Sequence, residues 1–321
     1  MRDTPVPLHP VLKGMLDKIA GLPAMQTLPV ETIRAGDLAR YSAVPRPEVG
    51  RVEERTVPGP RGDIRIRVYR PEGDGDRPVV VFFHGSGFVI CSLDTHDGMC
   101  RQICRGAQAV VVSVDYALAP ENKFPAGPDD SLAATRWVAA NAASLGGDPS
   151  RLALAGDSAG GTMAIVTALR LRDEGGPRPA AMLLMYPVTD FPSVDTPSYA
   201  ERGSGFGLTA DGMRWFWDHY LRGPEDAGNP HASPLRAESL AGLPPAYIVT
   251  AGYDILRDEG EALADRLERE NIRVTRRRYE DMNHGFMSWI GIVDRSGEAM
   301  EAACAWLRAE LTAVSSSRAR P

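Results

Sequence analysis

The 321-residue chain is 43% hydrophobic and 24% charged, which is ordinary usage for a globular protein and excludes global disorder. Its formal net charge of -6 offers no positive field that would gather phosphates, so we expect neither nucleic acid nor a stable membrane association as partners. No window approaches about eighteen consecutive apolar residues. Residues 1–7 lack the apolar core of a secretory signal, which predicts a cytoplasmic protein.

Residues 1–50 have the pattern of short helices interrupted by prolines. They precede the first strand pattern, and we interpret them as the N-terminal part of a cap. Strand patterns follow at 52–57 and 64–69, where β-branched residues flank a turn rich in glycine and proline. These two segments predict an opening antiparallel hairpin.

Short runs that are almost wholly apolar come next, and such runs are typical of parallel strands buried on both faces. They occupy residues 79–83, 110–114, 152–155, 180–185 and 246–250. Helical patterns alternate with them at 129–141, 159–172 and 259–270. With the hairpin and a last strand at 274–279, the alternation predicts an α/β fold with a mostly parallel eight-stranded sheet flanked by helices.

Residues 190–237 interrupt this alternation with a long loop and an aromatic helix around 213–220. An insertion of this size in a compact domain is usually functional, so we interpret it, together with residues 1–50, as a helical cap over the carboxyl ends of the strands. The main domain then comprises residues 51–189 and 238–311. Residues 312–321 are expected to form a disordered tail.

The four cysteines are too few and too scattered for a disulfide framework: Cys91, Cys100, Cys104 and Cys304. Cys100 and Cys104 stand at helical spacing, yet no Cys or His cluster completes a tetrahedral metal set nearby. We therefore expect buried reduced thiols and no metal ion.

Ser158 lies in the run Gly156-Asp157-Ser158-Ala159-Gly160-Gly161. A Gly-x-Ser-x-Gly match is weak by itself, because chance supplies roughly 0.2 matches in a chain of this composition. Here the match directly follows the apolar strand at 152–155 and opens a helix, which is the setting that a nucleophile elbow requires. Gly156 and Gly160 leave room for strand and helix to approach each other around the strained turn. The context predicts that Ser158 is a nucleophile.

A serine hydroxyl needs an adjacent base, which a third group must orient. Among the six histidines, His284 follows the last strand, where this type of fold presents its base. Asp254 follows the strand at 246–250 by a short turn and completes the chain order serine, acid, histidine. We expect Asp254 to be the orienting acid.

Other titratable residues have simpler explanations. Helix capping accounts for Asp258 and Glu259, and Asp190 follows the preceding strand and opens the cap. The histidines to which we assign no catalytic role are interpreted as surface or packing residues: His9, His96, His219 and His231.

Attack on an ester builds negative charge on the carbonyl oxygen, so fixed N–H donors must already point there. One donor is expected to be the Ala159 N–H, directly after the nucleophile. The others are expected from Ser86 and Gly87 in His84-Gly85-Ser86-Gly87, a loop that follows the strand at 79–83. An ordinary strand-to-helix turn remains the alternative for this loop. His84 is interpreted as a residue that fixes the loop.

Taken together, these segments resemble the hormone-sensitive lipase group of esterases, the bacterial family IV lipolytic enzymes. The loop at 84–88 is similar to the His-Gly-Gly-Gly motif of that family, and Gly156-Asp157-Ser158-Ala159-Gly160-Gly161 matches its serine motif. The segment at 115–121 is similar to the family's Tyr-Arg-Leu-Ala-Pro-Glu sequence, and 254–260 and 284–286 continue the likeness. The resemblance covers roughly residues 52 to 310.

Two residues depart from the family pattern. Ser86 replaces the middle glycine of the oxyanion loop, so a positive φ at this position would carry strain of order 1 kcal/mol. The donated group is a backbone N–H, and we expect the oxyanion hole to survive. Ala117 replaces an arginine, which removes an ion-pairing group from the loop but touches no chemical step.

The resemblance implies an α/β-hydrolase fold, hydrolysis of esters with short acyl chains, no cofactor, a helical cap over the pocket, and dimerisation through the edge strand near Val274 to Tyr279. Candidate pocket walls are Phe88, Phe206, Trp215 and Phe286, although aromatic residues at such positions belong to the core at least as often. Two alternatives stay open: an amidase or arylformamidase with the same residues, and a small-molecule receptor on this fold, against which His284 argues.

Overall fold

An eight-stranded sheet in the order β1-β2-β4-β3-β5-β6-β7-β8 forms the centre of the computed structural model, which describes residues 6–191 and 196–318. β1 pairs antiparallel with β2, and β2 antiparallel with β4, whereas all later neighbours are parallel. The strands are β1 (Arg51–Gly59), β2 (Gly62–Arg70), β3 (Arg77–Phe83), β4 (Val110–Val114), β5 (Gly147–Asp157), β6 (Ala181–Met185), β7 (Ala246–Tyr253) and β8 (Val274–Asn283). The predicted sheet and its opening hairpin are confirmed.

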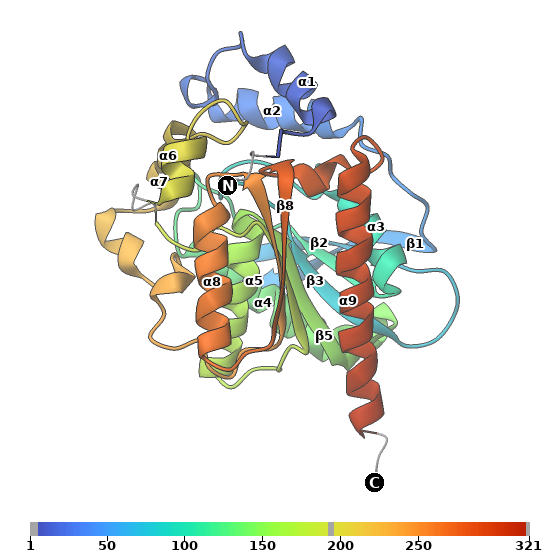
Figure 1. Ribbon diagram of the computed structural model, residues 1–321. Coiled ribbons are helices and arrows are strands. Elements are labelled where there is room, and N and C mark those ends of the chain that lie inside the picture. Colours follow the sequence, from blue (N-terminus) through green and yellow to red (C-terminus); the bar gives the residue numbers. More distant parts are fainter. Residues whose placement is uncertain (1–5, 192–195, 319–321) are drawn as a thin grey trace.

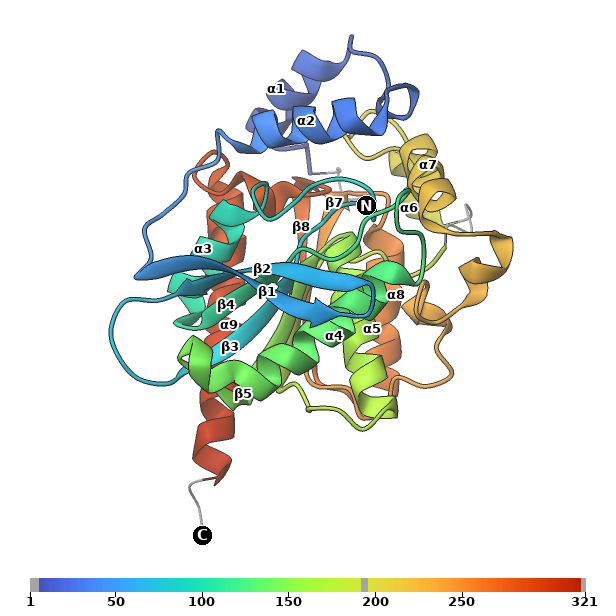
Figure 2. The ribbon, with the colours of Figure 1, turned by 180° about the vertical axis from the view of Figure 1, so that it is seen from behind.

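Helices cover both faces of this sheet (Figures 1 and 2). One face carries α3 (Asp97–Ala107) and α9 (Asp294–Arg318). The other carries α4 (Ala126–Asn141), α5 (Ala159–Asp173) and α8 (Arg257–Arg269). The molecule is thus a three-layer α/β fold.

Strand β3 shows why the central strands are apolar throughout. Val79 and Val81 belong to the core cluster on the α4 and α5 side, and Val80 and Phe82 to the cluster on the α3 and α9 side. All four side chains are fully buried. Because both faces of the strand are covered by helices, the sequence shows an apolar run in place of an alternating pattern.

Most elements of the segments interpreted as a cap lie beyond the carboxyl ends of β7 and β8 (Figure 1): α1 (Pro10–Ile19), η1 (Met25–Thr27), α2 (Val30–Tyr41), α6 (Pro197–Arg202) and α7 (Ala210–Tyr220). The elements that follow α7 are η3 (Pro224–Gly228) and η4 (Pro234–Arg236), and η4 packs against α5 and α8 at the side of the sheet. Arg34 of α2 fastens the N-terminal part to the main domain, because its guanidinium donates to Glu121 at 2.7 and 2.9 Å and to the carbonyls of Val89 and Ala119. A bidentate pair of this kind fixes orientation as well as distance.

Helix α9 corrects the expectation of a disordered tail from residue 312. The helix continues to Arg318, and residues 319–321 lie outside the described part of the chain. Leu307 and Leu311 are fully buried, so the helix is anchored close to the point where disorder was expected. Because this packing holds the helix in place, each further residue can extend it by one hydrogen bond.

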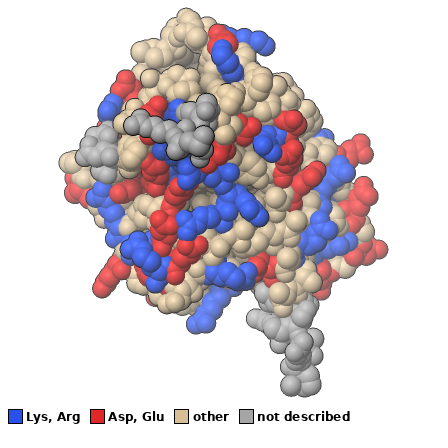
Figure 3. All heavy atoms as spheres, in the orientation of Figure 1, with Lys and Arg blue, Asp and Glu red and all other residues tan. Residues whose placement is uncertain are grey.

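Acidic and basic side chains are interspersed on the face of the molecule shown in Figure 3, and the region of α1 and α2 at the top carries fewer of them. No helix in residues 6–191 and 196–318 combines the length and the apolar character needed to cross a bilayer.

Candidate active site

Ser158 occupies the turn between β5 and α5, with φ 53° and ψ -123°. A non-glycine residue held in this region costs of order 1–3 kcal/mol, and such strain persists where the surroundings enforce it. The Ser158 N–H donates to the Met185 carbonyl of β6 at 2.8 Å, and its own carbonyl accepts from Gly161 at 2.9 Å. These bonds hold the side chain at the carboxyl end of the sheet.

Two glycines allow this turn to close. A Cβ at Gly156 would collide with the carbonyl of Gly160, and a Cβ at Gly160 would collide with the carbonyl of Phe83 in β3. Any larger residue at either position would therefore push the strand and the helix apart.

His284 lies between Ser158 and Asp254. Its Nε2 is 2.9 Å from Ser158 Oγ, and its Nδ1 is 2.8 Å from Asp254 Oδ2. Asp254 is 1% exposed, and its second oxygen accepts the Leu256 N–H at 2.9 Å. A carboxylate can only accept, so the hydrogen bond places a proton on Nδ1 and leaves the Nε2 lone pair facing the serine hydroxyl.

The competing acids lie elsewhere and serve other contacts. Asp258 accepts the Ser198 N–H of cap helix α6 at 2.7 Å and pairs with Arg257 at 2.7 Å. Burial would raise the pKa of Asp258, but Arg257 and Ser198 outweigh burial and lower it. Glu259 accepts the Thr189 N–H at 2.7 Å, and burial holds its pKa well above the ordinary range. Asp190 pairs with Arg236 at 2.5 Å, within the inserted segment.

The His84–Gly87 loop runs beside the serine turn. The Gly85 N–H donates to Asp157 Oδ1 at 2.6 Å, and a Cβ at Gly85 would collide with that carboxylate. Within the described residues, the N–H groups of Ser86, Gly87 and Ala159 have no protein acceptor, so all three are free to donate to a bound oxyanion.

Positive φ falls on Gly87 (52°) and Phe88 (67°). Ser86 is not among the described residues with positive φ. The backbone strain that a positive φ would cause at this serine is therefore absent.

His84 is fully buried and its ring stacks on Tyr116 at a centroid distance of 4.7 Å. Burial and the neighbouring His96 lower the pKa of His84 to about 4. A neutral, stacked ring of this kind agrees with a residue that fixes the loop.

His96 was interpreted from sequence as a surface or packing residue, and the structure gives it a more specific position. It is 3% exposed, its Nε2 lies 3.3 Å from Asp157 Oδ1, and its Nδ1 lies 2.8 Å from Thr95 Oγ1. Burial would raise the pKa of Asp157, but His96, the Gly85 N–H and His84 outweigh burial and lower it. Asp157 therefore links the serine turn, the oxyanion loop and His96. No motif marks this contact in the sequence.

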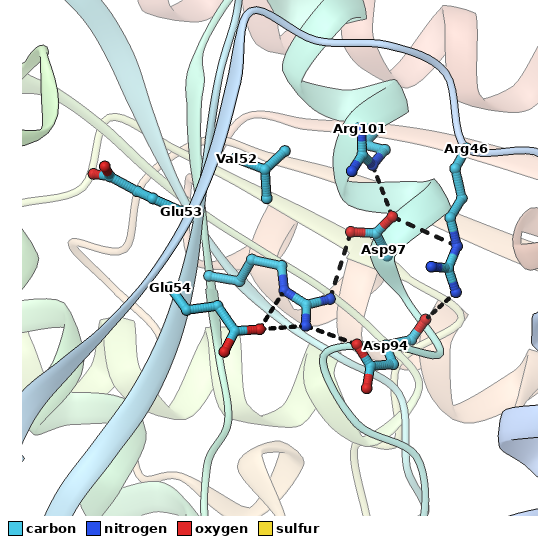
Figure 4. Close-up of a pocket in the computed structure, with 8 residues that line it drawn as sticks. Arg46, Val52, Glu53, Glu54, Asp94, Asp97 and Arg101 are labelled. Atoms are coloured by element: carbon cyan, nitrogen blue, oxygen red, sulfur yellow. Dashed lines mark hydrogen bonds and ion pairs between the residues drawn. The ribbon is translucent and has the colours of Figure 1, made fainter.

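A charged cavity of about 280 Å³ lies where α3 begins (Figure 4). Asp97, the first residue of α3, accepts from Arg101 at 2.7 Å and from Tyr69 at 2.9 Å, and pairs with Arg46 at 3.6 Å. Arg67 reaches the same carboxylate at 3.5 Å. The cavity is lined by arginines and carboxylates that neutralise one another, and these contacts hold the helix start that follows His96.

The four candidate pocket aromatics lie in different surroundings. Phe286 is fully buried against Tyr186 and Tyr279, and Phe88 stacks on Tyr220 at 3.9 Å, so both are packed in the protein core.

The two cap aromatics lie in the inserted segment. The Phe206 carbonyl accepts from Asn283, the neighbour of His284, at 3.0 Å. The Trp215 ring lies against His219 at a centroid distance of 4.1 Å, with the two rings tilted by 38°.

Phe216, which the sequence did not single out, lies against the oxyanion loop. A Cβ at Gly87 would collide with the Phe216 ring, and Phe216 is 5% exposed. Trp215, Phe216 and Trp217 are consecutive in α7, and helical spacing alone does not show which of the three faces the His84–Gly87 loop. Tyr186 was also missed: it has φ 38°, and its ring meets His284 edge to face at 5.0 Å.

The loop around Ala117 is anchored by a different arginine from that of the family motif. Asp130 accepts the Ala117 N–H at 3.0 Å and pairs with Arg61 of the β1–β2 turn at 2.6 Å. Arg61 thus supplies a charge at the loop that lacks the motif arginine.

All four cysteines are free thiols, and Cys91 is the one that is partly exposed. In the described part of the chain, no group of three or more His, Cys, Asp or Glu side chains has the arrangement of a metal site.

The fold and the residues around Ser158 are those of a hydrolase. Residues 80–288 match the family model described as alpha/beta hydrolase fold. The chain belongs to this family, and the resemblance to its hormone-sensitive lipase group is confirmed.

The chain is similar to known esterases over most of its length. It is 44% identical to Esterase LipI of Mycobacterium tuberculosis over 87% of both chains. It is 43% identical to Carboxylesterase NlhH of the same species, over 95% of this chain and 97% of the relative. The structure of the hyperthermophilic esterase from the archaeon Pyrobaculum calidifontis superposes with a TM-score of 0.90 at 41% identity, covering 96% of this chain and 100% of that one.

Proposed function

We propose that this protein, a carboxylic ester hydrolase like its relatives, hydrolyses esters of short-to-medium acyl chains through an acyl-enzyme intermediate. Ser158 is the nucleophile, His284 the general base and Asp254 the orienting acid. The observation that carries the proposal is the continuous relay from Ser158 Oγ through His284 to Asp254, with contacts of 2.9 and 2.8 Å.

In the first half-reaction, Ser158 Oγ attacks the ester carbonyl carbon while His284 Nε2 accepts the hydroxyl proton. The carbonyl oxygen becomes an oxyanion, which the N–H groups of Ser86, Gly87 and Ala159 would bind. His284 then gives the proton to the departing alcohol oxygen as the tetrahedral intermediate collapses to the acyl-enzyme. Throughout, the Asp254 carboxylate stabilises the imidazolium.

In the second half-reaction, a water molecule takes the place of the alcohol. His284 removes one proton from the water as its oxygen attacks the acyl carbon, and then returns that proton to Ser158 Oγ as the carboxylic acid leaves. The same oxyanion donors serve both steps.

Short-to-medium acyl groups are favoured by the cap. Phe216 lies against Gly87, so an aromatic ring borders the oxyanion loop and limits the space beside the reacting carbonyl. A site bordered by bulky side chains discriminates against longer chains by steric exclusion.

The two alternatives are not favoured. The relatives are named as esterases, which does not favour an amidase or arylformamidase. A non-catalytic receptor would not need a base within hydrogen-bond distance of the serine, whereas His284 Nε2 lies 2.9 Å from Ser158 Oγ.

Burst kinetics with p-nitrophenyl acetate test this function. The wild type is expected to release p-nitrophenol in a burst followed by steady turnover, and Ser158→Ala to release none above the uncatalysed rate. A parallel p-nitroanilide of equal acyl length measures the amide preference. Binding without turnover by the wild type would refute the esterase proposal, and faster anilide hydrolysis would favour the amidase.

A homodimer through β8 is also part of the proposal. β8 is an edge of the sheet, and side chains on its middle section, Arg276 to Arg278, are exposed. An unpaired edge can add a strand from a second copy. Sedimentation velocity should give a dimer that Arg277→Pro disrupts, because proline removes a ladder donor. A monomeric wild type at micromolar concentration would refute the dimer.

A further inference from the structure

The Ser86 hydroxyl lies inside the oxyanion loop, at the position where the motif of the family has glycine. Its Oγ accepts the Phe88 N–H at 2.8 Å and lies 2.6 Å from the hydroxyl of Tyr116. Ser86 is 3% exposed and Tyr116 is 2% exposed, so both hydroxyl groups exchange hydrogen bonds within the protein and not with bulk water.

The proton order in this cluster follows from counting donors. The Tyr116 hydroxyl donates its one proton to the His84 carbonyl at 2.7 Å. Toward Ser86 it can then only accept, so Ser86 donates to Tyr116 while accepting from Phe88. The result is one directed chain from the Phe88 N–H through Ser86 and Tyr116 to the His84 carbonyl, and it joins the two ends of the loop.

This chain stabilises an unusual backbone. Gly87 and Phe88 both have positive φ, at 52° and 67°, and a non-glycine residue such as Phe88 adopts this conformation only when its surroundings enforce it. The bond from the Phe88 N–H to Ser86 supplies such enforcement from within the loop. With glycine or alanine at 86, that buried N–H would lose its side-chain acceptor.

Tyr116 connects the loop to the rigid sheet. It follows β4, its ring stacks on His84 at 4.7 Å, and it meets Phe83 of β3 edge to face at 6.5 Å. On the opposite side, Asp157 holds the Gly85 N–H at 2.6 Å. The loop is therefore fixed at Gly85 by a carboxylate and at Ser86 and Phe88 by a hydroxyl chain.

We propose that the Ser86 hydroxyl and Tyr116 form a brace that fixes the oxyanion loop, which makes both side chains positioning residues for the ester hydrolysis proposed above. The Ser86 side chain does not touch the substrate. It keeps the backbone donors of Ser86 and Gly87 in the orientation that a developing oxyanion requires, because preorganised donors stabilise a transition state only when they already point at the charge.

The experiment compares Ser86→Ala, Tyr116→Phe and the double variant with the wild type. Ser131→Ala is the matched control, because Ser131 is also a fully buried serine with a bonded hydroxyl, to the Gly127 carbonyl at 2.8 Å in α4. Each protein is measured for kcat and KM on p-nitrophenyl acetate and for Ki of an alkyl trifluoromethyl ketone. That inhibitor adds to the serine and places an oxyanion in the hole. Thermal unfolding verifies that each variant is folded.

Ser86→Ala and Tyr116→Phe should each lower kcat by about tenfold, less than the 10²–10³-fold loss of a whole donor. KM should stay within about twofold, and Ki should rise by the same factor as kcat falls. The double variant should be no worse than the poorer single variant, because the two hydroxyls act in one chain. Wild-type kcat and Ki in either folded variant, or losses that multiply in the double variant, would overturn the brace.

Amide hydrogen exchange gives a readout that does not depend on ester turnover. The loop at 85–89 should exchange faster in Ser86→Ala and Tyr116→Phe than in the wild type and Ser131→Ala. Unchanged exchange would overturn the brace whatever the activity. Absent ester turnover by the wild type would instead refute the proposed function.

Discussion

Among single residues, two nearby aspartates have carboxylates that face different partners. Asp254 and Asp258 are four positions apart, yet one contacts His284 and the other the start of α6. Sequence reasoning separated the two by position, because Asp254 follows a strand and completes the chain order of serine, acid and histidine, whereas Asp258 begins a helix. Asp254 is the one whose carboxylate lies 2.8 Å from His284 Nδ1.

We predict that Asp254→Asn lowers kcat about 10⁴-fold, because an amide facing Nδ1 favours the wrong tautomer of His284. Asp258→Asn should lower kcat by no more than about tenfold, because an amide oxygen can still accept the Ser198 N–H. Steady-state kinetics on p-nitrophenyl acetate measure both. A larger loss in Asp258→Asn than in Asp254→Asn would overturn the assignment of the acid.

At the scale of elements, all eight strands were predicted. Apolar runs indicated five of them, because strands buried on both faces have no polar alternation, and β-branched residues around a turn indicated the β1–β2 hairpin. Helix α3 was not predicted. It opens at Asp97 inside a network of arginines and carboxylates that are distant in sequence, and no local pattern records such contacts. The sequence likewise did not distinguish Trp215 from Phe216, because these two aromatic residues differ only in which side of α7 they occupy.

Replacing Phe216 by alanine should broaden the acyl range, because the ring that lies against Gly87 is removed. We expect the ratio of kcat/KM for p-nitrophenyl decanoate over acetate to rise about tenfold. Trp215→Ala is the control, because that indole lies against the His219 ring. This variant should leave the ratio within about twofold. An unchanged ratio in Phe216→Ala would show that this ring does not limit the acyl group.

At the scale of the whole molecule, the proposed nucleophile, base, acid and oxyanion loop come from the ends of β5, β8, β7 and β3. Parallel strands bring these ends to one edge of the sheet, and the serine motif together with the chain order predicted which residues lie there. The contacts behind these residues were not predicted. His96 and Tyr186 belong to no motif and contact the site through burial. Tyr116 lies in the motif-like segment 115–121, but the motif does not reveal its contact with Ser86.

Burial of His84 gives the molecule a pH-dependent stability. Its pKa of about 4 in the folded state lies below its ordinary value of 6.5, so the unfolded chain takes up the proton first as the pH falls. This stability is fully present above pH 6.5 and is lost between about 6.5 and about 4, by about 3 kcal/mol.

Urea unfolding at several pH values should show this slope in the wild type and in His219→Gln, the control at a half-exposed histidine of α7. His84→Gln should have a shallower slope over the same range, because it cannot take up the proton. Equal slopes for His84→Gln and the wild type would show that His84 is not the source of this pH dependence.

The proposed chemistry depends on Ser158 as the nucleophile. Treatment with a p-nitrophenyl alkylphosphonate, followed by peptide mapping by mass spectrometry, identifies the residue that attacks. We predict one adduct per chain, located on Ser158 and formed in step with the loss of esterase activity, and none in Ser158→Ala. An adduct on another residue that accompanies inactivation, or undiminished turnover by Ser158→Ala, would contradict the claim.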